Sequence, residues 1–162
     1  MDASPQDNEY LKSLTVLYVE DDAESMEQLS EFLSRVVGVL ITATNGSEGF
    51  SAYNKHHPDI IITDIRMPVM DGLTMLQNIR GLARGKLVPA LVLTAFEQEA
   101  VVKHNCNVGM YTYIVKPVDG FILYESLLEC SHRLQANNKR LRQASSKRLI
   151  AKTSRLNYAR KH

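Results

Sequence analysis

The stretch PDIIITDIRMPVMDG, from Pro58 to Gly72, joins a short apolar run to an acidic side chain at its end. The run is rich in β-branched residues and does not alternate between polar and apolar positions, which is typical of a strand buried on both faces. Asp64 closes the run. Because a carboxylate at the end of a buried strand is costly unless a cation or hydrogen-bond donors stabilise it, the stretch predicts that Asp64 belongs to a polar site.

Similar apolar runs recur along the chain and alternate with amphipathic segments. Five runs lie between Leu14 and Lys116, namely LTVLYV, VLITAT, DIIIT, ALVLT and YTYIV. Strands that alternate with helices predict an α/β fold, in which helices cover both faces of a parallel sheet. The segments AESMEQLSEFLSRVV and GLTMLQNIRGLAR carry apolar residues at helical spacing, and Asp22 is well placed to cap the first. A third helical segment, EQEAVVKHNCNVG, ends at Gly109.

Polar side chains follow four of these runs. Glu20 and Asp21 follow the first, Asp64 ends the third, Thr94 ends the fourth and Lys116 follows the fifth. The carboxyl ends of parallel strands meet at one edge of the sheet, where open α/β sheets bind their ligands, so we expect these side chains to lie close together. Three carboxylates at one edge repel each other. A hard divalent cation such as Mg²⁺, which takes carboxylate and phosphate oxygens, would relieve that repulsion.

Together these residue types suit phosphoryl transfer. A carboxylate such as Asp64 can act as a nucleophile and form an aspartyl phosphate. The metal and the ammonium of Lys116 would stabilise the negative charge of the transferred group. The hydroxyl of Thr94 can donate a hydrogen bond to a phosphoryl oxygen. The residues themselves therefore indicate a Mg²⁺-dependent phosphoacceptor site.

Four pieces of the chain together resemble a known family. The acidic pair after the first run, DIRMPVMDG around Asp64, VLTA after the fourth run and YIVKP after the fifth look like the receiver domain of bacterial two-component response regulators, of the chemotaxis-regulator type. The resemblance covers residues 12–135. It implies a doubly wound (βα)5 fold, in which a parallel five-stranded sheet has the flavodoxin-like order 2-1-3-4-5.

The resemblance also implies a metal site and a phosphoacceptor. Asp64 would accept a phosphoryl group from a sensor histidine kinase or a phosphotransfer protein. Glu20 and Asp21 would hold Mg²⁺, with Asp64 as a third ligand and the backbone carbonyl of Arg66 as a fourth. Asp22 would cap a helix and would not bind the metal.

Further positions match the parts of the family that respond to phosphorylation. Thr94 resembles the switch hydroxyl, Tyr113 the aromatic residue that turns inward with it, and Lys116 the lysine that pairs with the phosphoryl group; the Lys116–Pro117 bond would be cis. The signal would leave through the face made by the helix at 97–109, the strand at 111–115 and the last helix. Arg66 and Phe96 resemble the pair that tunes the lifetime of the phosphoryl group.

Two other classes of protein share parts of this pattern. A phosphatase of the haloacid dehalogenase type also uses a strand-end aspartate with Mg²⁺, but it needs a second acid two residues later, where this chain has Arg66. A flavodoxin-like flavin carrier needs a Ser/Thr-rich phosphate loop where this chain has EDDAES, whose acids would repel a flavin phosphate. We therefore expect a signalling switch and not an enzyme.

Charge divides the chain into two parts. Residues 1–130 carry nine basic and 18 acidic residues, a net charge of −9, whereas residues 131–162 carry ten basic residues and no acid. We expect residues 1–11 to be disordered, 12–135 to form the receiver, and 136–162 to form a basic helical extension or linker. No apolar run approaches the roughly 20 residues that cross a bilayer, and MDASPQDNEY lacks the features of a signal peptide. We therefore expect a cytoplasmic protein without a membrane span.

The basic extension leaves several interpretations open. Leu127, Leu134 and Leu141 lie seven residues apart, which favours a helix that forms a homodimer or leads to an output domain, although the intermediate positions are poorly apolar. The segment could instead be attracted to nucleic acid, to a membrane or to an acidic partner surface such as its own receiver, or be disordered after about Arg142. Thirty-two residues without a core cannot form a winged-helix domain, so we expect neither sequence-specific transcription control nor a nucleic-acid partner for this chain alone. The chain would be a stand-alone phosphorelay or docking module, or the N-terminal receiver of a longer regulator; its kinase, stimulus and output are not encoded in these motifs.

Overall fold

The computed structural model describes residues 4–95 and 111–159. Its centre is a parallel sheet of five strands in the order β2-β1-β3-β4-β5, which confirms the predicted strand order. The strands are β1 (Thr15–Val19), β2 (Val39–Ala43), β3 (Ile60–Asp64), β4 (Ala90–Thr94) and β5 (Tyr111–Val115). Within the described ranges, no helix combines the length and the apolar character needed to cross a membrane.

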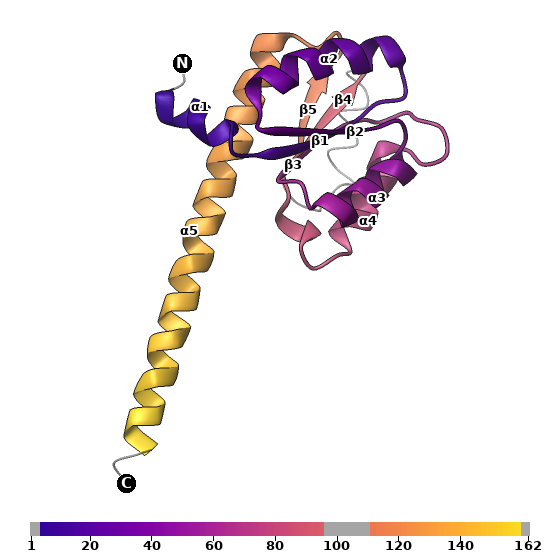
Figure 1. The fold of residues 1–162 in the computed structure, drawn as a ribbon. Coiled ribbons are helices and arrows are strands. Elements are labelled where there is room, and N and C mark those ends of the chain that lie inside the picture. Colours follow the sequence, from indigo (N-terminus) through magenta and orange to yellow (C-terminus); the bar gives the residue numbers. More distant parts are fainter. Residues whose placement is uncertain (1–3, 96–110, 160–162) are drawn as a thin grey trace.

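Helices cover both faces of the sheet (Figure 1). On one face lie α2 (Ala23–Val36) and the first part of α5 (Gly120–Ala159), and on the other lie α3 (Gly46–His56) and α4 (Gly72–Arg80). A short 3₁₀ turn, η1 (Gly85–Leu87), precedes β4. Side chains of β1 and β3 alternate between two hydrophobic cores, one under each helical layer, so these strands are buried on both faces as their uninterrupted apolar runs predicted.

The strand register gathers the carboxyl ends at one edge. Val19, the last residue of β1, pairs with Thr63, and Asp64 pairs with Leu93. Thr94, the last residue of β4, pairs with Val115, after which Lys116 follows. The residues that come directly after the strands therefore lie side by side.

A helix that the sequence did not predict precedes the sheet. Pro5–Leu11 forms α1, so the prediction that residues 1–11 are disordered is wrong for this segment. Ser4 and Asp7 form a capping box, and Leu11 is buried in the core beneath α2 and α5. Seven residues are too few to hold a helix in water without such packing.

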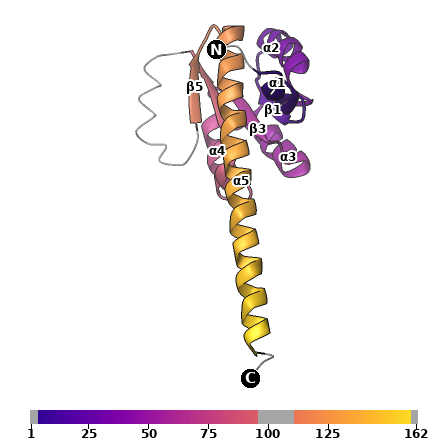
Figure 2. The same cartoon turned by 90° about the vertical axis from the view of Figure 1, so that its left-hand side faces the viewer.

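The last helix, α5, runs without a break from Gly120 to Ala159. It crosses the expected boundary after residue 135 and continues past Arg142, after which the sequence left disorder open. Figures 1 and 2 show it leaving the receiver and extending well beyond the body. Leu127 is buried in the receiver core and Leu134 packs against it, whereas the side chain of Leu141 is exposed. The seven-residue spacing therefore begins as part of the receiver core and is not one continuous dimer seam.

Candidate phosphoacceptor site

Three carboxylates meet at the carboxyl edge of the sheet. Oxygens of Glu20, Asp21 and Asp64 all lie within 4.8 Å of one another. Glu20 is buried, Asp64 is half-buried and Asp21 is exposed. Glu20 and Asp21 come from the loop after β1 and Asp64 from the end of β3, so the strand register brings together the acids that the sequence singled out. Three carboxylate ligands with an open side are a donor set that suits a hard cation such as Mg²⁺.

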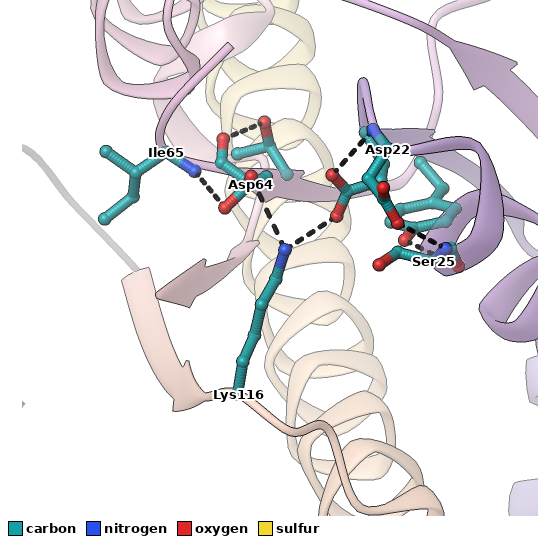
Figure 3. A network of polar contacts seen from close by, with 8 residues as sticks. Asp22, Ser25, Asp64, Ile65 and Lys116 are labelled. Carbon is teal, nitrogen blue, oxygen red and sulfur yellow. Dashed lines mark hydrogen bonds and ion pairs between the residues drawn. The ribbon is translucent and has the colours of Figure 1, made fainter. Parts of the chain in front are cut away.

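Lys116 points into this cluster (Figure 3). Its ammonium Nζ lies 2.9 Å from Glu20 Oε2 and 3.4 Å from Asp64 Oδ2. Its backbone amide donates to the carbonyl of Thr94 at 2.7 Å, which fixes the start of the loop after β5. The Lys116–Pro117 bond is cis, as the resemblance implied. The lysine therefore bridges two carboxylates that come from different strands.

Burial and charge act against each other at this edge. Burial raises the pKa of the Glu20 and Asp64 carboxyls above the ordinary value, although the Lys116 ammonium acts in the opposite direction. Burial by itself lowers the pKa of Lys116, but the hydrogen bond to Glu20 and the charge of Asp64 outweigh it and raise that pKa above its ordinary value. One ammonium thus compensates only in part for the clustered carboxylates.

The loop after β3 holds Asp64 in place. The Ile65 amide donates to Asp64 Oδ1 at 2.9 Å (Figure 3). The Gly72 amide closes the loop by donating to the Ile65 carbonyl at 2.9 Å. At the tip, the Met70 amide donates to the Pro68 carbonyl at 2.8 Å. This tight γ-turn places Val69 at a φ of 70°, which is unusual for a β-branched residue.

Gly72 is a requirement of the site that the sequence analysis missed. A Cβ at this position would lie 2.0 Å from the carbonyl oxygen of Asp64 and 2.7 Å from Thr63 Oγ1. No side chain fits there unless the loop moves. Asp71 caps α4 and Gly72 is its first residue; this Asp-Gly pair could have signalled the requirement, since such pairs mark tight turns. Arg66, the expected carbonyl ligand, belongs to the same loop, and its side chain is exposed.

The loop after β1 is fixed by a helix cap. Asp22 accepts a hydrogen bond from the Ser25 amide at 2.8 Å and begins α2, which confirms its predicted role as a cap. That bond holds the pKa of Asp22 below its ordinary value. Tyr18, which the sequence analysis did not single out, is buried and donates through its hydroxyl to the Ser25 carbonyl at 3.3 Å. Burial raises the pKa of this phenol, so it remains a neutral donor.

The two expected switch residues lie on neighbouring strands. Thr94 is buried at the end of β4, and Tyr113 on β5 packs against the core beneath α3 and α4. The expected tuning residue Phe96, the helix expected at 97–109 and its last residue Gly109 lie outside the described residues. The structure therefore places Thr94 at the same sheet edge as the acidic cluster and Tyr113 on the neighbouring strand, and the helix that would complete the expected output face lies outside the described residues.

Strand order, acidic cluster and lysine together define a receiver-type α/β domain. A family model of the response regulator receiver domain matches residues 16–127. The chain belongs to this family and is a receiver domain of a two-component response regulator.

Relatives of two lengths match the chain. A probable C4-dicarboxylate response regulator DctR of Priestia megaterium is 39% identical over 108 residues, which are 65% of this chain and 46% of that protein. The chain thus spans about half the length of this relative. An uncharacterized 14.6 kDa protein of Leptolyngbya boryana is 30% identical over 67% of this chain and 83% of its own length.

Solved structures show the same fold. The N-terminal domain of an uncharacterized protein from Wolinella succinogenes matches with a TM-score of 0.66 and 35% identity, over 77% of this chain and 99% of that one. CheY of Borrelia burgdorferi, solved as a complex with CheX, BeF3 and Mg²⁺, matches with a TM-score of 0.64 and 32% identity, over 72% of this chain and 87% of the matched one.

Proposed function

We propose that this chain is a phosphorylation-controlled switch, in which Asp64 accepts a phosphoryl group from the phosphohistidine of a sensor kinase or a phosphotransfer protein. The observation that carries the proposal is the meeting of Glu20, Asp21 and Asp64 within 4.8 Å, with Lys116 bridging two of them. Receiver domains typically bind Mg²⁺ at an acidic pocket of this kind. The similarity to a CheY that was solved with BeF3 and Mg²⁺ supports the same chemistry.

The residues divide the work of the transfer. An oxygen of Asp64 forms a bond to phosphorus while the bond between phosphorus and the donor imidazole nitrogen breaks, and that nitrogen keeps the electron pair. The product is a mixed phosphoric–carboxylic anhydride. Mg²⁺, held by Glu20, Asp21, Asp64 and the Arg66 carbonyl, would supply positive charge to the phosphoryl oxygens. Lys116 supplies the second positive charge, since its ammonium already contacts Asp64.

The response to phosphorylation starts at Thr94. Its hydroxyl can donate to a phosphoryl oxygen on Asp64, because the two residues end neighbouring strands. Movement of Thr94 would let Tyr113 turn inward and reshape the face that β5 and α5 share with residues 97–109. The phosphoryl group stays on the chain until water removes it, so the protein acts as a switch and not as an enzyme with a separate substrate.

Two arrangements of the output are consistent with the relatives. The match to the longer DctR regulator favours a receiver that works with a further output domain, and the match to the short Leptolyngbya protein favours a stand-alone module in the cytoplasm. A homodimer through α5 stays a third prediction. Light scattering with Mg²⁺, with and without beryllofluoride, tests it, because only a phosphorylation-driven dimer gains mass in a way that Asp64→Asn abolishes.

Labelling with acetyl phosphate and Mg²⁺ tests the phosphoacceptor. We expect intact-mass spectrometry to show one added phosphoryl group on the chain, none on Asp64→Asn and little on Asp21→Asn. Asp22→Asn is the matched control, because it changes the same charge one residue away and asparagine still caps a helix. Labelling of Asp64→Asn at the wild-type level, or equal loss in Asp22→Asn, would refute the proposal.

A further inference from the structure

The distal half of α5 carries a concentration of positive charge that the switch does not use. We call residues 139–159 of α5 the basic arm. Between Lys139 and Ile150 every side chain is exposed, five of the twelve are Lys or Arg, and none is acidic. The remaining residues include Gln143, Ser145 and Ser146, which are neutral hydrogen-bonding side chains. Residues 131–162 carry ten basic residues and no acid, which is far more positive charge than surface solubility requires.

The receiver body holds this arm away from itself. Figures 1 and 2 show α5 extending well clear of the sheet and its helices, and twenty-one helical residues span about 30 Å. Helix α1 fixes the base of the arm, because Tyr124 bonds to Asn8 and His132 Nε2 lies 2.8 Å from Asp7 Oδ1. The body carries a net charge of −9, so a negatively charged ligand is repelled by the body and attracted by the arm.

Three kinds of partner can be separated by the positions of the side chains. Two arms side by side would repel, because each carries basic residues and no acid. A membrane surface needs one apolar face, yet the exposed apolar side chains Leu141, Leu149 and Ile150 spread over about 180° of the helix at about 100° per residue, and Arg142 falls within that spread. The basic arm is therefore suited neither to a dimer seam nor to a membrane surface. Its positive charge favours a polyanion as the partner.

The positions of the Lys and Arg side chains around the helix distinguish an acidic protein surface from duplex DNA as the partner. Arg140 and Lys147 lie seven residues apart on one side of the helix, whereas Arg142 lies about 160° from Arg140. A flat acidic protein surface would contact only one of these sides. A helix in the major groove of duplex DNA has phosphates along both walls of the groove. From this distribution we propose that the basic arm binds duplex DNA through its backbone phosphates, without reading the base sequence.

This inference goes beyond the phosphoacceptor function and differs from the expectation drawn from the sequence. That expectation, that nucleic acid is not a partner of this chain alone, rested on the lack of a folded domain that could read a base sequence. Contact with phosphates needs only an exposed, preformed cationic helix. If the five cations between Lys139 and Arg148 each neutralise one phosphate, log K should fall against log salt with a slope of about −4.5. Affinity would then drop about 500-fold between about 50 and 200 mM salt.

Fluorescence anisotropy of the full chain with a labelled duplex of about two helical turns tests the inference. The arm variant and the body variant each remove three exposed positive charges and replace them with glutamine, a good helix former. The arm variant combines Arg140→Gln, Lys147→Gln and Arg148→Gln, and the body variant combines Lys55→Gln, Arg84→Gln and Lys86→Gln. Circular dichroism of both variants checks that α5 remains helical.

We expect the arm variant to flatten the salt slope by about 2.7 and the body variant to leave both slope and affinity unchanged. Two duplexes of unrelated sequence should bind equally, and Asp64→Asn should bind like the wild type, so the result is independent of the phosphoacceptor. Equal loss in both variants would overturn the inference. So would binding to polyglutamate or to phosphatidylserine vesicles as tight as to the duplex, because either result would assign the arm to an acidic protein or to a membrane.

Discussion

Replacing Gly72 by alanine tests whether the loop after β3 positions Asp64. The added Cβ would lie 2.0 Å from the Asp64 carbonyl oxygen and 2.7 Å from Thr63 Oγ1, and ordinary contacts of this kind begin at 3.4 Å. The loop must therefore move by more than 1 Å or lose the bond from the Gly72 amide to Ile65. Overpacking of this kind costs about 1–3 kcal/mol. A contact of 2.0 Å with a backbone atom belongs at the upper end of this range, and alanine recovers up to about 1 kcal/mol in a helix, so we expect a net loss of about 2 kcal/mol.

Urea unfolding measures the stability loss, and acetyl phosphate labelling measures the displacement of Asp64. Gly81→Ala is the matched control, because Gly81 ends the same helix with helical φ and ψ and its added Cβ meets nothing closer than 3.3 Å. We expect that control to be neutral or to gain up to about 1 kcal/mol of stability, and to label like the wild type. A Gly72→Ala chain that unfolds at the wild-type urea concentration and labels at the wild-type rate would refute the reasoning.

Three further substitutions test other parts of the structure. In EDTA at neutral pH, Lys116→Met should lower the free energy of unfolding by about 1–3 kcal/mol, because buried Glu20 loses the ammonium that neutralises it. This loss should shrink as acid protonates the Glu20 carboxyl. A loss that does not depend on pH would contradict this. Val69→Gly should raise the free energy of unfolding by about 0.5–1 kcal/mol, seen as a higher urea midpoint, since φ is positive and the side chain is 84% exposed. His132 and the Ser4 cap lower the pKa of Asp7 below its ordinary 3.8, so the stability that Asp7 adds is present above that pH and is lost below it. Thermal melts of Asp7→Asn should therefore differ from those of the wild type at neutral pH and converge with them in acid. A difference that stays constant with pH would exclude this effect.

The site residues were more predictable from the sequence than the loop contacts that hold them in place. One rule, that residues following parallel strands meet at one edge, was enough to bring Glu20, Asp21, Asp64 and Lys116 together, because it needs only the positions of the strands. The contact of Gly72 with the Asp64 carbonyl depends on how the loop folds back, and a motif in one dimension does not show that distance. The positive φ of Val69 is likewise fixed by the surrounding turn and not by the preference of valine.

Helix α1 and the base of α5 show a different limit. Pro5–Leu11 has too few residues to indicate a helix by itself, and it is held by Tyr124 and His132, more than a hundred residues later. The seven-residue leucine spacing suited both a receiver core and a dimer seam. The structure assigns its first members to the core because Leu127 faces the sheet. Pattern alone cannot distinguish these two uses, since both require only that one helical stripe be apolar.

The charges at this edge of the sheet explain why Asp64 is only half-buried and why a cation is favoured beside it. Three carboxylates and one ammonium leave an excess of negative charge at the edge, and burial raises the pKa of Glu20 and Asp64 even though Lys116 lies within 3.4 Å of both. A fully buried site would remove this excess by protonation, and a fully exposed one by solvation. Because Asp64 is half-buried, its charge stays accessible, and the excess favours a divalent cation beside it. The geometry that makes the metal-free edge costly therefore favours a cation there, and under the proposed function that cation would prepare Asp64 for a phosphoryl group.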